Sequence, residues 1–263
     1  MKLSVSNIAW APEHDAAVFA MMQKAGCTGL EIAPTRILPD NPYDRISEAV
    51  RFAAAVREEY GFCVPSMQSI WFGRTEKVFG PPEERARLVS YTQKAVDFAE
   101  AIGCGNLVFG CPRHRVLPEG ADPAAAVPFF REIAEYARAH HTVIALEANP
   151  PMYHTNFVNT TAEALELIRE VGSEGFRLNL DIGTMIENGE SVSVIRGTER
   201  LIHHVHLSEP GLGAIQKRPL HRELAECLRA AGYAGFVSLE TGRCGDSEAL
   251  KRMIGILAET FGS

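Results

Sequence analysis

The sequence predicts an α/β fold, a single (β/α)₈ TIM barrel in which residues 1–263 form one domain. Two observations support this prediction. A short, mostly apolar run followed by a longer segment with helical periodicity recurs eight times along the chain, and such alternation leaves either a closed barrel or a doubly wound open sheet. No Gly-x-Gly-x-x-Gly motif follows the first apolar run. The nucleotide-binding turn of an open sheet is therefore missing, and the closed barrel is favoured.

The eight short runs are interpreted as buried parallel strands because they are mostly apolar on both faces rather than alternately apolar and polar. Helices on the outside of the barrel would cover them. In chain order, the predicted strands are Leu3–Asn7, Gly29–Ala33, Val64–Gln68, Asn106–Phe109, Val143–Glu147, Phe176–Asp181, His203–Leu207 and Phe236–Glu240.

The longer segments carry apolar residues at the spacing of one helix face. The predicted helices are Ala16–Ala25, Ile46–Tyr60, Glu83–Ile102, Ala124–Ala139, Ala164–Val171, Ser191–Ile202, Leu220–Ala231 and Glu248–Phe261. Thr160 and Glu163 form a capping signal before the fifth of these helices. Ser191–Ile202 is the weakest helix, because it contains β-branched residues and Gly197.

The chain has a net charge of −7, a sequence pI near 5.7 and an apolar fraction of 46%. These values are typical of a globular protein and argue against nucleic acid or an anionic membrane as a partner. The six cysteines lack CxxC spacing, which indicates reduced thiols in a cytoplasmic protein. Because no segment reaches about 18 consecutive apolar residues and the N-terminus shows no secretion signal, we expect neither a membrane span nor export.

Four consecutive predicted strands end in a side chain that can bind a metal ion: Glu147, Asp181, His206 and Glu240. Corresponding ends of neighbouring barrel strands converge on one face, so we expect the four groups to lie together. A buried carboxylate is unfavourable unless it is paired or metal-bound, and three of them would repel one another without a cation. The oxygen-rich set with one imidazole suits Mn²⁺, Mg²⁺ or Co²⁺, and Zn²⁺ or Fe²⁺ less specifically.

With these residues in place, the chain resembles the xylose isomerase-like barrel superfamily, and within it the sugar phosphate isomerase/epimerase and ketose 3-epimerase branch. The resemblance runs from Gly29-Leu-Glu-Ile through His206-Leu-Ser-Glu-Pro to Gly232-Tyr-Ala-Gly-Phe-Val-Ser-Leu-Glu240. It implies that Glu147, Asp181, His206 and Glu240 bind one divalent ion, usually Mn²⁺. It also implies that the two glutamates flank the substrate carbon and act as acid and base.

This chemistry agrees with the residue types. Removal of a proton next to a carbonyl gives an ene-diolate, whose negative oxygens a divalent ion stabilises. Bases on the two faces of the carbon permit epimerisation, and return of the proton to the adjacent carbon gives aldose–ketose isomerisation. The expected protein is therefore a carbohydrate isomerase acting on a ketose or keto-sugar. By analogy with similar barrels, we expect a homodimer or homotetramer.

The chain departs from the branch at two positions. Thr184 stands where the branch commonly has a histidine, and Ser208-Glu209-Pro210 replaces the positive side chain that many 3-epimerases carry shortly after the metal-binding histidine. Residues expected to contact the sugar combine aromatic platforms with hydrogen-bonding groups. They are Trp10, Gln68, Trp71, His114, Asn149, His154, Asn156, Thr184, His221 and Arg243.

Three other functions fit the same scaffold. A dehydratase or lyase acting on an inosose or hydroxy-ketone would share the first proton abstraction. A sugar-binding barrel without catalysis would keep the metal site, although the presence of both Glu147 and Glu240 argues against it. An endonuclease IV-like barrel needs more histidines around its metal cluster than this chain, with nine in all and a net charge of −7, is expected to supply.

Overall fold

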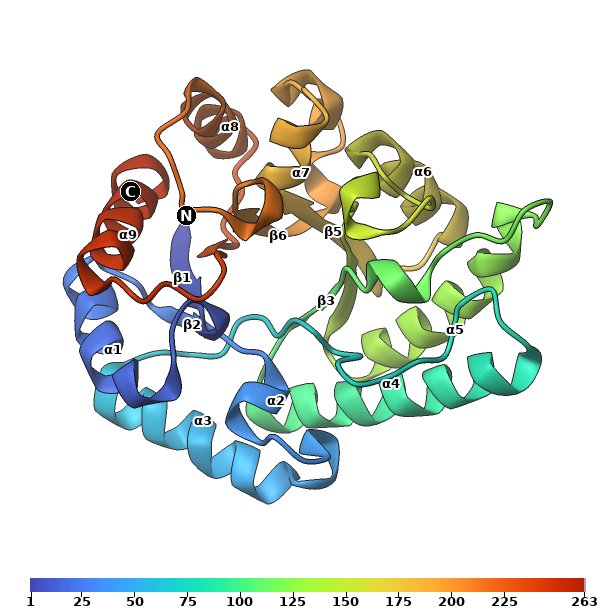
Figure 1. Ribbon diagram of the computed structural model, residues 1–263, viewed down its shortest axis with the longest axis horizontal. Helices are drawn as coiled ribbons and strands as arrows, with labels where there is room; N and C mark the ends of the chain where they lie inside the picture. The colour runs from blue at the N-terminus through green and yellow to red at the C-terminus, as the bar shows by residue number, and fades with distance from the viewer. Residues whose placement is uncertain (263) are drawn as a thin grey trace.

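The computed structural model describes residues 1–262, in which seven parallel strands form one curved sheet with the strand order β2-β1-β7-β6-β5-β4-β3. The strands are β1 (Lys2–Ser6), β2 (Gly29–Glu31), β3 (Asn106–Phe109), β4 (Val143–Leu146), β5 (Phe176–Asp181), β6 (Ile202–Leu207) and β7 (Phe236–Leu239). Every neighbouring pair is parallel. The helices between the strands form a ring around them (Figure 1), so the predicted barrel fold is confirmed.

Residues 63–68 lie between β2 and β3 and close the barrel. Cys63 bridges Gly29 of β2, and Met67 bridges both Ile32 and Leu107. The predicted strand Val64–Gln68 is therefore in the expected place but is wrong as a regular strand. Pro65 has no backbone N–H to donate, so this segment pairs only through isolated bridges.

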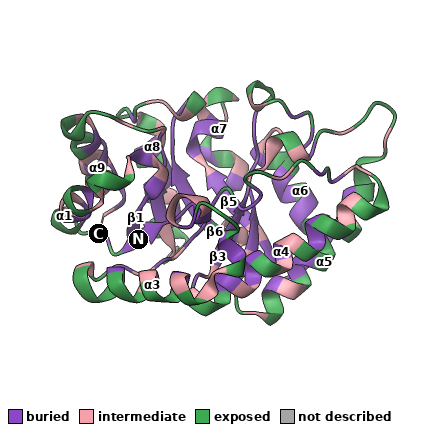
Figure 2. Cartoon of the chain, turned by 60° about the horizontal axis from the view of Figure 1, so that its bottom comes forward, coloured by how far each residue is buried: buried purple, intermediate pink, exposed green. Residues whose placement is uncertain are grey.

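Nine helices accompany the strands within the described residues. They are α1 (Asp15–Lys24), α2 (Pro34–Ile37), α3 (Ile46–Tyr60), α4 (Pro82–Ile102), α5 (Ala126–Ala139), α6 (Thr161–Val171), α7 (Ile182–Glu187), α8 (Pro219–Ala230) and α9 (Ser247–Phe261). The buried residues lie in the strands and on the inward helix faces, while exposed residues lie on the outside (Figure 2). No helix in residues 1–262 is both long and apolar enough to cross a membrane.

The predicted helix Ser191–Ile202 is wrong. This segment forms two short 3₁₀ turns, Val192–Ile195 and Glu199–Leu201, with Gly197 between them at φ +79°. A left-handed residue and several β-branched residues do not support a continuous helix. The helix that follows β5 is instead α7, which begins directly after Asp181. The short helix α2 was not predicted, because its sequence is rich in proline.

The interior of the barrel contains a chain of buried polar contacts rather than apolar layers alone. Ser4 Oγ lies 2.5 Å from Ser238 Oγ, and Ser238 Oγ lies 2.8 Å from His204 Nε2. His204 Nε2 is also 3.1 Å from Glu31 Oε2. All four residues are at most 1% exposed, and the network leads from Ser4 in the middle of β1 to Glu31 at the end of β2.

The capping signal at the start of α6 is confirmed. Thr160 accepts a hydrogen bond from the Glu163 backbone N–H, and the Glu163 side chain accepts one from the Thr160 backbone N–H. These bonds satisfy donors that the first helical turn leaves without partners.

We expect Thr160→Ala to lower the free energy of unfolding by about 1 kcal/mol, because the capping oxygen is lost. Urea denaturation of the variant measures this difference. The exposed Thr28, changed to alanine, provides a control that should leave stability within about 0.5 kcal/mol of the wild type. Equal stability of the two variants would contradict a capping role.

Candidate active site

The four candidate metal-binding residues lie at the carboxyl ends of adjacent strands. Asp181 is the last residue of β5 and pairs in register with His206 of β6. Glu147 and Glu240 directly follow β4 and β7, and their backbone N–H groups continue the ladder to Phe109 and Leu207. The sheet therefore delivers all four side chains to one end of the barrel, as the strand spacing predicts.

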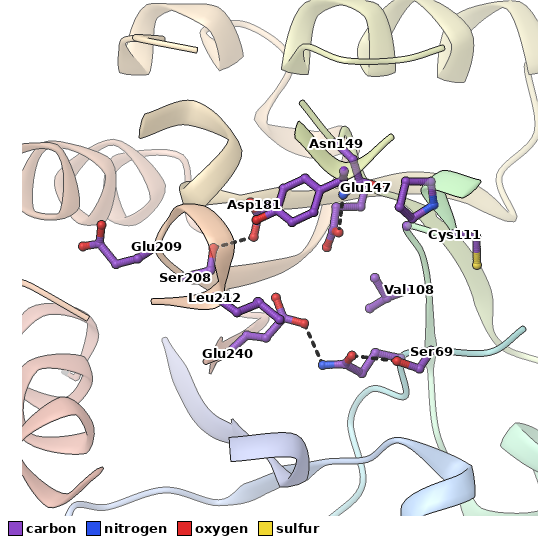
Figure 3. A pocket seen from close by; sticks show the side chains of 14 residues that line it. Ser69, Val108, Cys111, Glu147, Asn149, Asp181, Ser208, Glu209, Leu212 and Glu240 are labelled. Atoms are coloured by element: carbon purple, nitrogen blue, oxygen red, sulfur yellow. Dashed lines mark hydrogen bonds between the residues drawn. The ribbon is translucent and has the colours of Figure 1, made fainter. Parts of the chain in front are cut away.

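His206 lies at the centre of this group. Its Nδ1 atom is 3.0 Å from Glu147 Oε2 and 3.1 Å from Glu240 Oε2. One ligand atom from each of Glu147, Asp181, His206 and Glu240 can be chosen so that all four lie within 4.8 Å of one another. The three carboxylates turn toward a common space (Figure 3).

Asp181 is oriented from two directions. Its Oδ2 accepts a 2.5 Å hydrogen bond from Ser208 Oγ, and its Oδ1 accepts a 2.6 Å bond from the Thr184 backbone N–H. Ser208 Oγ also accepts the Gly183 N–H at 2.8 Å. A Cβ on residue 183 would lie 2.8 Å from this hydroxyl, so glycine is needed there to let Ser208 approach Asp181.

Neutral amides hold the two glutamates. Asn179 Nδ2 donates to Glu147 Oε2 at 2.6 Å, and Asn149 Nδ2 donates to Glu147 Oε1 at 2.9 Å. On the other side, Gln68 Nε2 donates to Glu240 Oε1 at 2.7 Å. Amides fix the direction of the carboxylates without cancelling their charge. The negative potential at the centre is therefore retained.

Glu31 is a functional residue that the site prediction missed. It ends β2, is fully buried, and places Oε2 3.1 Å from His206 Nε2. This contact leaves His206 Nδ1 directed at Glu147 and Glu240. A carboxylate on the far nitrogen of a histidine is the usual way to orient a metal-binding imidazole. The Gly29-Leu-Glu-Ile motif contained the signal, but only barrel closure brings β2 near β6.

The electrostatics of the site are those of an unbalanced negative cluster. Burial, together with Glu147 and Glu240, raises the pKa of Asp181 from 3.8 to about 7. Burial also raises the pKa of Glu240, despite the opposing effect of His206. For His206, burial is outweighed by Glu240 and Glu31, and its pKa lies well above the ordinary value.

The donor set fits a divalent cation. Three carboxylates and one imidazole nitrogen match the hard, oxygen-rich ligation of Mn²⁺ or Mg²⁺. Burial, with Glu147 and Glu240, raises the pKa of Asp181, and a bound cation would offset this unfavourable effect on its charged form. A second trio, Glu31, His204 and His206, also converges, and we interpret it as the network that orients His206. The residues that would hold an ion are therefore Glu147, Asp181, His206 and Glu240.

The three carboxylates of Glu147, Asp181 and Glu240 line a pocket of about 180 Å³. Of the residues expected to contact a sugar, Gln68 and Asn149 line it. Sequence reasoning missed Tyr153, whose hydroxyl accepts the Gly211 N–H at 2.9 Å. The remaining lining residues are Ser69, Val108, Gly110, Cys111, Pro112, Glu147, Asp181, Ser208, Glu209, Leu212 and Glu240. Glu209 points away from the space between the other carboxylates (Figure 3) and pairs with Arg218 at 2.6 Å.

Three expected contacts line a neighbouring pocket instead: Trp71, His114 and His154. Trp71 is 1% exposed and donates from Nε1 to Thr92 Oγ1 at 2.9 Å. His114 Nε2 is bonded to the Arg74 carbonyl at 2.9 Å, and His154 is exposed. These residues therefore lie beyond the carboxylates rather than beside them.

The other five expected contacts line neither pocket. Trp10 is buried and donates to Asp15 Oδ1 at 2.7 Å, and the Thr184 hydroxyl donates to the Ala148 carbonyl at 2.9 Å. Asn156 is bound to the backbone of Leu117, and Arg243 is exposed. His221 is buried, with neither ring nitrogen bonded to another group in residues 1–262. These five side chains are thus buried, bonded elsewhere or exposed away from the two pockets.

Residues 19–259 match the family described as xylose isomerase-like TIM barrel. The chain belongs to this family. The match covers most of the chain and includes all four candidate metal-binding residues, so the resemblance noted from the sequence is confirmed.

Individual relatives are more distant. Over 125 residues, or 45% of the chain, the sequence is 30% identical to a D-psicose 3-epimerase of Enterocloster bolteae; that stretch spans 40% of the relative's length. The fold matches a D-psicose 3-epimerase of Clostridium cellulolyticum, solved with D-tagatose, at a TM-score of 0.79 and 18% identity over 100% of this chain and 98% of that one. It also matches an Escherichia coli 3-keto-D-glucoside 4-epimerase at 0.75 and 20% identity, over 98% and 99%.

Glu31→Gln should weaken Mn²⁺ binding by about 10- to 100-fold, because the His206 ring loses the charged partner that orients it. Calorimetric titration of Mn²⁺ into the metal-free protein measures the affinity. The exposed Glu13→Gln is the matched control for the loss of one negative charge. An unchanged affinity in Glu31→Gln would contradict the assigned role.

Asp181→Asn should change how the stability of the metal-free protein depends on pH. Because the folded pKa of Asp181 is raised from 3.8 to about 7, its protonated form stabilises the fold. This contribution is fully present below about pH 4 and is lost as the pH rises to about 7. The stability of the wild type relative to the variant should therefore fall over this range. Urea denaturation in chelator at several pH values tests this, and a constant difference would contradict it.

Proposed function

We propose that the protein is a metal-dependent sugar isomerase or epimerase, acting on a ketose or keto-sugar by moving a proton next to a carbonyl. The observation that supports this most directly is the placement of Glu147 and Glu240. Both carboxylates line the 180 Å³ pocket, and both contact the same atom of His206 from different strands. A small substrate between them would meet one carboxylate on each side.

The relatives support the same class of chemistry. The partial match to a D-psicose 3-epimerase and the full-length structural match to two epimerases agree with a sugar as substrate. The pocket size also fits, since about 180 Å³ lies below the range of about 300–1,000 Å³ that holds drug-sized ligands. The substrate portion that reacts is therefore about the size of one monosaccharide.

In the proposed reaction, one glutamate removes the proton from the carbon beside the carbonyl, and the other returns a proton to the opposite face. Glu147 is held for this task by Asn149 and Asn179, and Glu240 by Gln68. The two residues exchange roles in the reverse direction. A divalent ion, when bound, supplies stabilisation of the negative charge that develops on the substrate oxygens.

Two other outcomes start from the same site. A dehydratase would remove the same proton but then expel a hydroxyl group. Its product would therefore be the substrate minus one water molecule. A barrel that only binds sugar would not exchange protons at all. Product analysis after exchange with solvent distinguishes these functions from epimerisation.

The Mn²⁺-loaded protein should incorporate solvent deuterium into at least one of D-fructose, D-psicose, D-tagatose and 3-keto-D-glucose. Glu147→Gln and Glu240→Gln should each reduce the exchange rate by about 10²–10⁴-fold, since each removes an acid–base group. Proton NMR in deuterated water follows the exchange, with Glu13→Gln as the control. If the loaded wild type exchanged no sugar, the proposal would be wrong and the sugar-binding function would be favoured.

A further inference from the structure

A second pocket of about 530 Å³ lies beside the first. Ser69, Cys111, Pro112 and Tyr153 line both pockets. The outer pocket is formed by three loops, residues 69–74, 111–114 and 152–154. These loops follow the closing segment, β3 and β4 at the same end of the barrel as the carboxylates.

The lining of the outer pocket differs in chemistry from that of the inner pocket. The inner pocket is lined by Glu147, Asp181, Glu209 and Glu240, whereas no aspartate or glutamate lines the outer one among the described residues. Two of its apolar residues are exposed: Phe72 is 68% and Met152 46% exposed. The carboxylates are therefore confined to the inner pocket, and the outer one offers stacking and apolar contact.

The outer pocket also has a rigid base. The Trp71 ring is fixed by its bond to Thr92 and by edge contacts to Phe109 at 4.7 Å and His114 at 5.5 Å between ring centroids. Below the loops, the buried Arg115 donates to the carbonyls of Gly110 at 2.8 Å and Glu147 at 2.9 Å. The loops after β3 and β4 are thus tied to each other.

Three of the seven non-glycine residues with a left-handed backbone in residues 1–262 lie in the same three loops. Each contains one non-glycine residue with a left-handed backbone: Ser69 at φ 54°, Cys111 at φ 44° and His154 at φ 64°. Such conformations persist only where the surrounding structure enforces them, and they cluster at ligand-binding sites. This observation does not depend on the exposure of Phe72 and Met152, and it indicates the same place.

We propose that the outer pocket binds a second ring, joined by a glycosidic bond to the sugar that reacts in the inner pocket. The proposal rests on the proposed function and identifies the substrate class as a keto-sugar glycoside rather than a free monosaccharide. The inner pocket has room for one sugar, and a substituent on that sugar that points toward Tyr153 and Ser69 would enter the outer pocket. There it meets Phe72 and Met152, and a ring stacked on an aromatic side chain is a favourable contact.

A phosphate group is the less suitable occupant. The Arg74 guanidinium is paired with Glu76 and lies 4.8 Å from the centre of the Tyr91 ring. Of the two arginines in the lining, this leaves only Arg113, which is exposed. One exposed cation is a weak anion site compared with the bidentate or multiple contacts that phosphate sites use.

Two matched substrate pairs test the proposal: D-fructose with isomaltulose, in which glucose is joined to O6 of fructose, and 3-keto-D-glucose with its p-nitrophenyl glycoside. Within each pair the reacting carbons are the same. We expect the two-ring member to have a kcat/KM about tenfold higher in deuterium exchange in at least one pair. Phe72→Ala should remove this preference through KM and leave the one-ring substrate within about twofold. Val50→Ala is the control, since Val50 is an exposed apolar residue on α3 that lines neither pocket.

Calorimetric binding of the same four sugars gives a readout that does not need turnover. Exchange of one-ring sugars with no two-ring preference, in rate or affinity, overturns the second-ring site and leaves the proposed function intact. Absence of exchange with every sugar overturns the proposed function instead. A gain with D-fructose 6-phosphate but not with isomaltulose assigns the pocket to phosphate. Light scattering tests whether a second copy of the chain occupies the outer pocket, because it measures the molar mass of the assembly. If Phe72→Ala separates a dimer and lowers the affinity for all substrates equally, this face is an interface between copies. The proposal is then overturned.

Discussion

The contact between His206 and the carboxylates around it governs the rest of the site. One imidazole, fully buried, meets Glu31 through Nε2 and both Glu147 and Glu240 through Nδ1, at 3.0–3.1 Å. Because Glu240 and Glu31 outweigh the opposing effect of burial, the pKa of His206 lies well above the ordinary value and the ring carries a proton. A cation bound on the Nδ1 side would replace that proton. The arrangement therefore couples metal binding to proton release.

The neutral groups around the acids explain how this charge is preserved. Had lysine or arginine held Glu147 and Glu240, each carboxylate would have been neutralised by its partner, and little attraction for a divalent ion would remain. Amides from Asn149, Asn179 and Gln68 orient the oxygens without adding positive charge. Ser208 does the same for Asp181. The surrounding structure thus holds an unfavourable cluster of carboxylates in an arrangement that would suit a cation.

Features that depend on periodicity along the chain could be predicted from the sequence, whereas features that depend on contacts across the barrel could not. The strand-end positions of Asp181 and Glu240 follow from counting units of one strand and one helix. The role of Glu31 needs β2 and β6 to face each other, which only closure provides. Local effects also outweighed periodicity: Pro65 interrupted the third strand, and Gly197 with its β-branched neighbours prevented the predicted helix Ser191–Ile202.

The predicted sugar contacts show a further limit, because residue type alone does not distinguish a platform from a core residue. Trp10 and Trp71 are both buried, but Trp10 packs against Phe19 away from the pockets, and Trp71 forms the base of the outer pocket. The difference arises from the loops that carry them. The strand ends carry the carboxylates of the candidate site, and the loops after the closing segment, β3 and β4 carry the lining of the outer pocket. Changes in those loops can therefore alter what the outer pocket binds while leaving the strand-end carboxylates in place.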